Sequence, residues 1–118
     1  MQTLAQLLVL MVALLHIWFL VLEMFLWDQP LGRKTFRTTP EFAAASKALA
    51  ANQGLYNGFL AAGLLWGLAQ AESGRDVQLF FLGCVAIAGI YGGYSVSRRI
   101  LFVQAVPALV AALLVWLG

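Results

Sequence analysis

The segment ALLHIWFLVLEMFLW, Ala13–Trp27, is the part of this chain that decides its fold. It lies within an apolar run that starts near Leu4, and about 20 such residues are enough to cross a bilayer as one helix. The segment also carries His16 and Glu23, which are about two helical turns apart and so project from the same side of a helix. An ionisable group at membrane depth costs about 3 kcal/mol or more, and its default interpretation is a functional site with a partner. The partners of His16 and Glu23 should therefore lie in the rest of the chain.

The composition is that of an integral membrane protein. Of the 118 residues, 63% are hydrophobic and only 10% are charged, and the mean hydropathy is +0.89, whereas a soluble domain has about 25% charged residues. This length predicts a single transmembrane domain, 1–118. The net charge of +2 comes from a few residues predicted to lie in loops, and no basic stretch with interleaved aromatic residues exists, so we expect no nucleic-acid partner. The single cysteine, Cys84, allows no disulfide within the chain and no metal-ligand spacing, so we expect no metal and no cofactor.

Helix breakers divide the chain into four predicted helices, at about residues 4–27, 40–70, 77–94 and 100–117. Between the first two we expect a polar loop, Gln29–Thr39, with Pro30 and Gly32 ending the first helix. The second helix starts at Thr38-Thr39-Pro40-Glu41, where a threonine can cap, proline suits the first turn and the carboxylate favours the positive end of the dipole. At 1.5 Å per residue this helix exceeds a hydrocarbon core of roughly 30 Å, so its N-terminal part should lie at the interface. The predicted fold is all-α, an up-down-up-down four-helix membrane bundle whose last helix is kinked by Pro107.

Loop charges predict the orientation in the membrane. Arg33, Lys34 and Arg37 lie in the first loop, and Arg98 and Arg99 lie in the third turn. The positive-inside rule places both in the cytoplasm and both termini outside. No Lys or Arg precedes the first apolar run and no small-residue cleavage site ends it, so we expect a retained first helix rather than a signal peptide.

Polar side chains fall at a similar depth on all four predicted helices. Hydrocarbon offers these side chains no hydrogen-bond partners, so they should face one another or a water-filled cavity. We predict a pocket open to the cytoplasm with Glu23 near its centre and His16 deeper. The predicted ligand-binding residues are Glu23, His16, Asn52, Gln53, Tyr56, Asn57, Tyr91 and Gln104.

Each of these residues also has a simpler interpretation. Glu23 would reach the headgroups after a small shift in register, and His16 would donate one hydrogen bond to a neighbouring helix. The four candidates of the second helix span a wide arc, so at least one of them should serve helix–helix packing. The glycine pairs Gly54/Gly58 and Gly89/Gly93, each spaced i, i+4, let backbones approach in lipid, and the same surfaces would also serve a homodimer.

Several segments resemble the small bacterial membrane proteins known as domain of unknown function 1304. They are His16 and Glu23 with Phe25-Leu26-Trp27, then Asn52–Gly63 (NQGLYNGFLAAG), Ile90–Gly92 (IYG) and Gln104–Ala108 (QAVPA). The resemblance covers essentially the whole chain and implies a four-helix protein of the bacterial inner membrane. It implies no reaction, substrate or catalytic residue.

Three functions remain open from the residues. The first is binding or transport of a small organic or lipid-like ligand, coupled to protons through Glu23 and requiring a dimer for transport. The second is a membrane-embedded isomerase or hydratase on a lipid or isoprenoid-like substrate, with Glu23 and His16 as the candidate catalytic acid and base. The third is a structural or accessory protein in which the polar cluster only joins helices, each hydrogen bond contributing about 0.6 kcal/mol.

Overall fold

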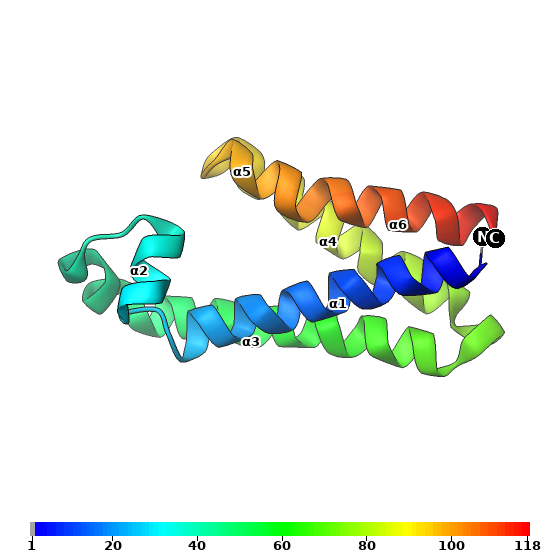
Figure 1. Ribbon diagram of the computed structural model, residues 1–118, viewed down its shortest axis with the longest axis horizontal. Helices are drawn as coiled ribbons and strands as arrows, with labels where there is room; N and C mark the ends of the chain where they lie inside the picture. Colours follow the sequence, from blue (N-terminus) through cyan, green and yellow to red (C-terminus); the bar gives the residue numbers. More distant parts are fainter. Residues whose placement is uncertain (1) are drawn as a thin grey trace. The chain divides into compact units, whose positions relative to one another are not determined.

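The computed structural model describes residues 2–118, and these residues form helices and turns without any strand. The elements in order are α1 (Gln2–Met24), α2 (Pro30–Phe36), α3 (Pro40–Ala69), the 3₁₀ turn η1 (Ala71–Gly74), α4 (Arg75–Ser95), α5 (Arg98–Ile100), the π-helical turn η2 (Leu101–Ala105) and α6 (Val106–Leu117) (Figure 1). The prediction of an all-α protein is confirmed.

Three helical segments of residues 2–118 are long and apolar enough to cross a membrane, namely Gln2–Met24, Ala71–Ser95 and Arg98–Leu117. These segments make the chain compatible with a membrane protein. The segment α3 is not among them, since Asn52, Gln53 and Asn57 interrupt its apolar sequence. Four crossings in an up-down-up-down bundle therefore stay a prediction.

Residue contacts divide the chain into two compact units. The first unit is Leu15–Phe59, and the second combines residues 2–14 with 60–118.

In the first unit, the start of α3 is as the sequence predicts. The backbone N–H of Phe42 donates to Thr39 Oγ1 at 3.1 Å, Pro40 occupies the first helical position, and Glu41 lies in the first turn. The cap satisfies one of the free N–H groups of the first turn, and the carboxylate stabilises the positive end of the helix dipole.

The segment between α1 and α3 differs from the predicted loop, because it contains the short helix α2. Pro30 does not end the preceding helix, which stops at Met24; it begins α2, where its fixed φ suits the first turn. Gly32 is buried with its Cα facing the Leu26 carbonyl, so a side chain would not fit there. Arg37 ends the helix in the left-handed conformation (φ 57°) and donates its N–H to the Arg33 carbonyl.

Trp27 fixes α2 against the first turns of α3. Its ring centroid lies 4.8 Å from that of Phe36, and its Nε1 donates to Ser46 Oγ at 3.0 Å. An ion pair between Lys47 Nζ and Asp28 Oδ2, 3.3 Å apart and largely exposed, adds little to this contact. Trp27 thus has packing partners on both α2 and α3.

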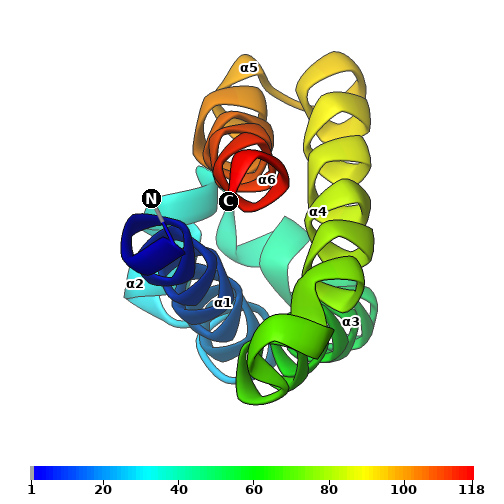
Figure 2. The same ribbon diagram turned by 90° about the vertical axis from the view of Figure 1, so that its right-hand side faces the viewer.

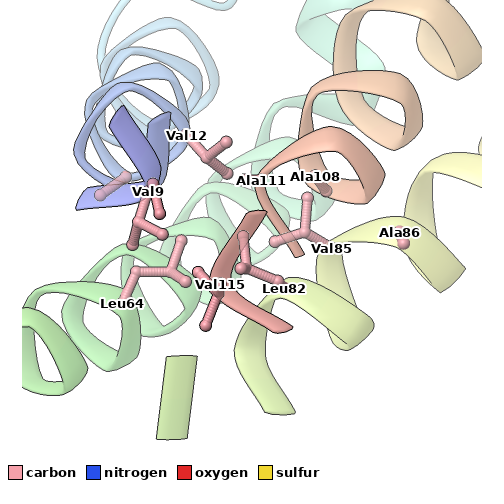
Figure 3. Packing of buried hydrophobic residues seen from close by; sticks show 11 residues of the cluster. Val9, Val12, Leu64, Leu82, Val85, Ala86, Ala108, Ala111 and Val115 are labelled. Carbon is pink, nitrogen blue, oxygen red and sulfur yellow. The ribbon is translucent and has the colours of Figure 1, made fainter. Parts of the chain in front are cut away.

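The second unit is held by a core of small and branched apolar side chains, and its helices α4 and α6 lie side by side (Figure 2). The buried residues of this hydrophobic cluster are Ala5, Val9, Val12, Ala13, Leu64, Leu82, Val85, Ala86, Ala108, Ala111 and Val115, most of which are labelled in Figure 3. Small residues dominate where α4 meets the last helical segment. A Cβ added to Gly89 would lie 2.5 Å from the backbone nitrogen of Ala105, so this glycine permits a backbone approach, as the glycine spacing predicted.

The last predicted helix, 100–117, is not one regular helix. It consists of α5, whose N-terminus is capped by Ser97 Oγ accepting from the Arg99 N–H at 3.2 Å, then the π-helical η2, then α6. Pro107 lies in the first turn of α6. Because proline has no N–H, the backbone carbonyl one turn before Pro107 lacks its usual helical donor. The wider, π-helical turn η2 lies directly before this proline.

Candidate functional site

The carboxylate of Glu23 is buried in the first unit and is bound by two amides of α3. Glu23 is 3% exposed. Its Oε1 accepts a hydrogen bond from Asn57 Nδ2 at 2.5 Å, and its Oε2 accepts one from Gln53 Nε2 at 2.6 Å. The structure thus joins three of the eight predicted residues in one cluster, which we call the Glu23 cluster.

The sequence Gln53-Gly54-Leu55-Tyr56-Asn57 explains how α3 builds this cluster. Gln53 and Asn57 are four residues apart, so both project from one face of the helix. Gly54 lies next to that face, and a Cβ added to it would be 2.7 Å from Met24 Cγ and 3.1 Å from Glu23 Cβ. The missing side chain therefore lets the backbone of α3 approach the end of α1.

The place of Glu23 on α1 is electrostatically unfavourable for a carboxylate. Glu23 is the second-last residue of α1, and the C-terminal end of a helix carries a partial negative charge that favours cations. Burial adds the cost of removing a polar group from water. The two amide donors offset these costs, and a cation at this position would do so as well.

The two amides differ in their surroundings. Asn57 is 8% exposed, whereas Gln53 is exposed. A long, exposed side chain is readily displaced by another molecule, and a buried one is held by its neighbours. The Oε2 edge of Glu23 is consequently the edge that a ligand could reach, and Asn57 fixes the orientation of the carboxylate.

The other predicted residues of the first unit do not join these hydrogen bonds. Asn52 and Tyr56 are exposed, and the Tyr56 ring lies edge-on to Phe59 at 5.6 Å. They lie on a different face of α3 from the Glu23 cluster, as the wide arc of the four candidates anticipates. His16 is fully buried, with its ring edge-on to Phe19 at 5.1 Å.

The last two predicted residues, Tyr91 and Gln104, belong to the second unit. Tyr91 is 71% exposed, and Gln104 is half-buried within the π-helical η2. Single π-helical turns are frequent at functional sites, which keeps Gln104 a candidate. A pocket shared by all eight residues stays a prediction.

The described residues offer no cluster of side chains that could bind a metal ion. Within residues 2–118, no group of three or more His, Cys, Asp or Glu side chains could hold a metal ion.

The fold and the cluster together define a class: an all-α protein with helices able to cross a membrane and a buried carboxylate held by two amides. Within that class, the chain belongs to the DUF1304 family of proteins of unknown function, which it matches over residues 10–116. The resemblance found in the sequence is thereby confirmed. No curated protein and no solved structure matches the chain.

Proposed function

We propose that this chain is a small multi-pass protein of the bacterial inner membrane that binds a small organic or lipid-like cation at Glu23 and, as a dimer, transports it. The observation that supports this most is the asymmetry of the Glu23 cluster: a buried carboxylate with one buried donor, Asn57, and one exposed donor, Gln53. A displaceable partner on one oxygen leaves that edge of the carboxylate open to exchange with a ligand.

Binding would proceed as an exchange at one oxygen. Asn57 keeps Oε1 in place while the cation displaces Gln53 from Oε2 and pairs with the carboxylate. When the cation leaves, a proton from water takes its place on the carboxyl group, so the charge of the site is balanced in both states. This exchange couples one proton to one monovalent cation moving in the opposite direction.

The proposed setting is the four-crossing arrangement with both basic loops in the cytoplasm. It would place Glu23 in the cytoplasmic half of the membrane. The expected partners are the bilayer, the ligand and a second copy of the chain.

Carbodiimide labelling tests whether Glu23 can be reached at all. Dicyclohexylcarbodiimide enters from the lipid phase and modifies protonated carboxyl groups. We expect it to modify Glu23 in the purified protein, to do so faster in Gln53→Ala, and to be slowed by tetraphenylphosphonium as a model cation. Peptide mass mapping locates the modified residue. Glu23→Gln is the negative control, because it has no carboxyl group at this position.

Two outcomes would contradict the proposal. One is an unmodified Glu23 in both the wild type and Gln53→Ala. The other is modification that tetraphenylphosphonium does not slow, while Glu41→Gln, an exposed glutamate outside the cluster, behaves as the wild type.

A structural clamp is the second candidate, because both oxygens of Glu23 already accept a hydrogen bond from α3. In that case Glu23→Gln would lower the melting temperature in detergent and change nothing else. An acid–base enzyme is the third candidate, and it requires a substrate to reach both Glu23 and the fully buried His16.

A further inference from the structure

The second unit contains a cavity that the Glu23 cluster does not use. Its volume is about 470 Å³, and its lining includes residues from the start of α1 and the end of α6. Its lining combines polar and apolar side chains from three segments: Gln2, Ala5, Gln6, Ala71, Glu72, Arg75, Gln78, Leu114, Val115 and Gly118.

Arg75 presents a positioned guanidinium to this cavity. Its Cζ lies 4.9 Å from the ring centroid of Trp116, and one terminal nitrogen donates to the Trp116 carbonyl at 3.1 Å. The other terminal nitrogen is 3.7 Å from Asp76 Oδ1, a loose pair with a highly exposed carboxylate. A guanidinium has five N–H donors, so donors remain for an anionic group of a ligand.

The same lining offers an acceptor for a cation and several amides. Glu72 is exposed at the cavity. Gln78 is buried, and its Nε2 donates to the Gly67 carbonyl at 3.2 Å, so its amide oxygen is the group that can accept from a ligand N–H. One positive and one negative side chain with amides beside them complement a molecule that carries both charges.

The position of the cavity indicates the source of such a molecule. Its walls are the ends of the three segments that are long and apolar enough to cross a membrane, so the cavity would open at the membrane surface. Leu114 and Val115 supply apolar contacts, and the exposed Trp116 is of the type that lies at headgroup level. We propose that this cavity binds a phospholipid headgroup carrying a phosphate and a primary ammonium, with Arg75 on the phosphate and Glu72 on the ammonium.

Lipids with matched acyl chains and different headgroups test this directly. Native mass spectrometry of the purified chain with phosphatidylethanolamine, phosphatidylcholine and phosphatidylglycerol measures the bound fraction of each. We expect phosphatidylethanolamine to bind best, because phosphatidylcholine has no N–H donors and phosphatidylglycerol has no ammonium. In Glu72→Gln, the ratio of bound phosphatidylethanolamine to bound phosphatidylglycerol should fall by up to about fivefold, which is the range of an exposed ion pair.

The variants separate recognition from folding. Arg75→Gln should weaken all three lipids by about tenfold or more, as loss of a charge-assisted phosphate contact does. Because Arg75 also contacts Trp116, the decisive variant is Glu72→Gln, whose exposed side chain is not needed for packing. Glu41→Gln, an exposed glutamate of the first unit, should bind lipids as the wild type does.

The proposal is overturned if the wild type binds the three lipids equally, or if Glu72→Gln leaves their ratio unchanged. Soluble phosphoethanolamine distinguishes the source of the headgroup. Displacement of the lipid by an equal concentration of phosphoethanolamine would assign the cavity to the free compound and overturn the lipid assignment.

Discussion

The two oxygens of Glu23 accept similar hydrogen bonds but lie in different surroundings, so removing their donors should have unequal effects. Asn57→Ala leaves Oε1 buried without a donor, and we expect it to lower the free energy of unfolding by about 1–3 kcal/mol. Gln53→Ala should cost less than about 1 kcal/mol, since water or a headgroup can replace an exposed donor. Unfolding of the detergent-solubilised protein in increasing sodium dodecyl sulfate measures both.

Asn52→Ala is the matched control for these variants. It removes an exposed amide from another face of the same helix and should change stability by less than about 0.5 kcal/mol. Equal losses for Asn57→Ala and Gln53→Ala would show that the two edges of the carboxylate are equivalent, and the proposed ligand entry at Gln53 would then be wrong.

The sequence contains enough information to group Gln53 with Asn57, although it does not show that this pair faces Glu23. A carboxylate in an apolar helix and a polar block in the next helix indicate a site, and the i, i+4 spacing of Gln53 and Asn57 already places those two on one face. Asn52 and Tyr56 form a second such pair on another face. Which pair faces Glu23 depends on the rotation of α3 about its axis, and that is set by packing contacts, among them the close approach at Gly54.

At the scale of the element, the contact between α4 and η2 depends on a missing side chain. A Cβ at Gly89 would lie 2.5 Å from the nitrogen and 2.9 Å from the Cα of Ala105, and backbone atoms cannot move aside as a flexible side chain can. We expect Gly89→Ala to destabilise the protein by about 1–3 kcal/mol, the usual cost of overpacking. The melting temperature in detergent measures this loss.

Gly83→Ala is the control within the same helix. An added Cβ at Gly83 meets nothing within 4 Å. Alanine favours a helix over glycine by about 1 kcal/mol, so this variant should be as stable as the wild type or more so. A Gly89→Ala variant as stable as Gly83→Ala would contradict the close approach seen here.

Two elements could not be predicted from local patterns. The helix α2 begins at a proline and contains a glycine, Gly32, and both residues are also typical of loops; the helix is stabilised by tertiary contacts of Trp27 with Phe36 and Ser46. The π-helical η2 leaves no periodicity in side chains over five residues, although Pro107 correctly indicated an irregularity nearby.

At the scale of the whole molecule, the number of crossings determines what the Glu23 cluster can do. Inserting α3 into hydrocarbon costs more free energy than inserting the other long helices, because the polar residues that bind Glu23 also lower the hydropathy of α3. Pairing removes part of that cost: an amide that is hydrogen-bonded to Glu23 is far less costly in hydrocarbon than an unpaired one. Formation of the cluster and insertion of α3 would thus support each other.

Cysteine labelling in intact bacteria tests whether α3 crosses. In a Cys84→Ser background, single cysteines replace the exposed residues Leu31 of α2, Ser73 of η1 and Val96 after α4. If α3 crosses and the basic loops are cytoplasmic, a membrane-impermeant maleimide labels Ser73→Cys in intact cells and labels Leu31→Cys and Val96→Cys only after permeabilisation. Labelling of Ser73→Cys and Leu31→Cys under the same condition would mean that α3 does not cross, since these positions flank it, and the proposed transport path past Glu23 would then be impossible.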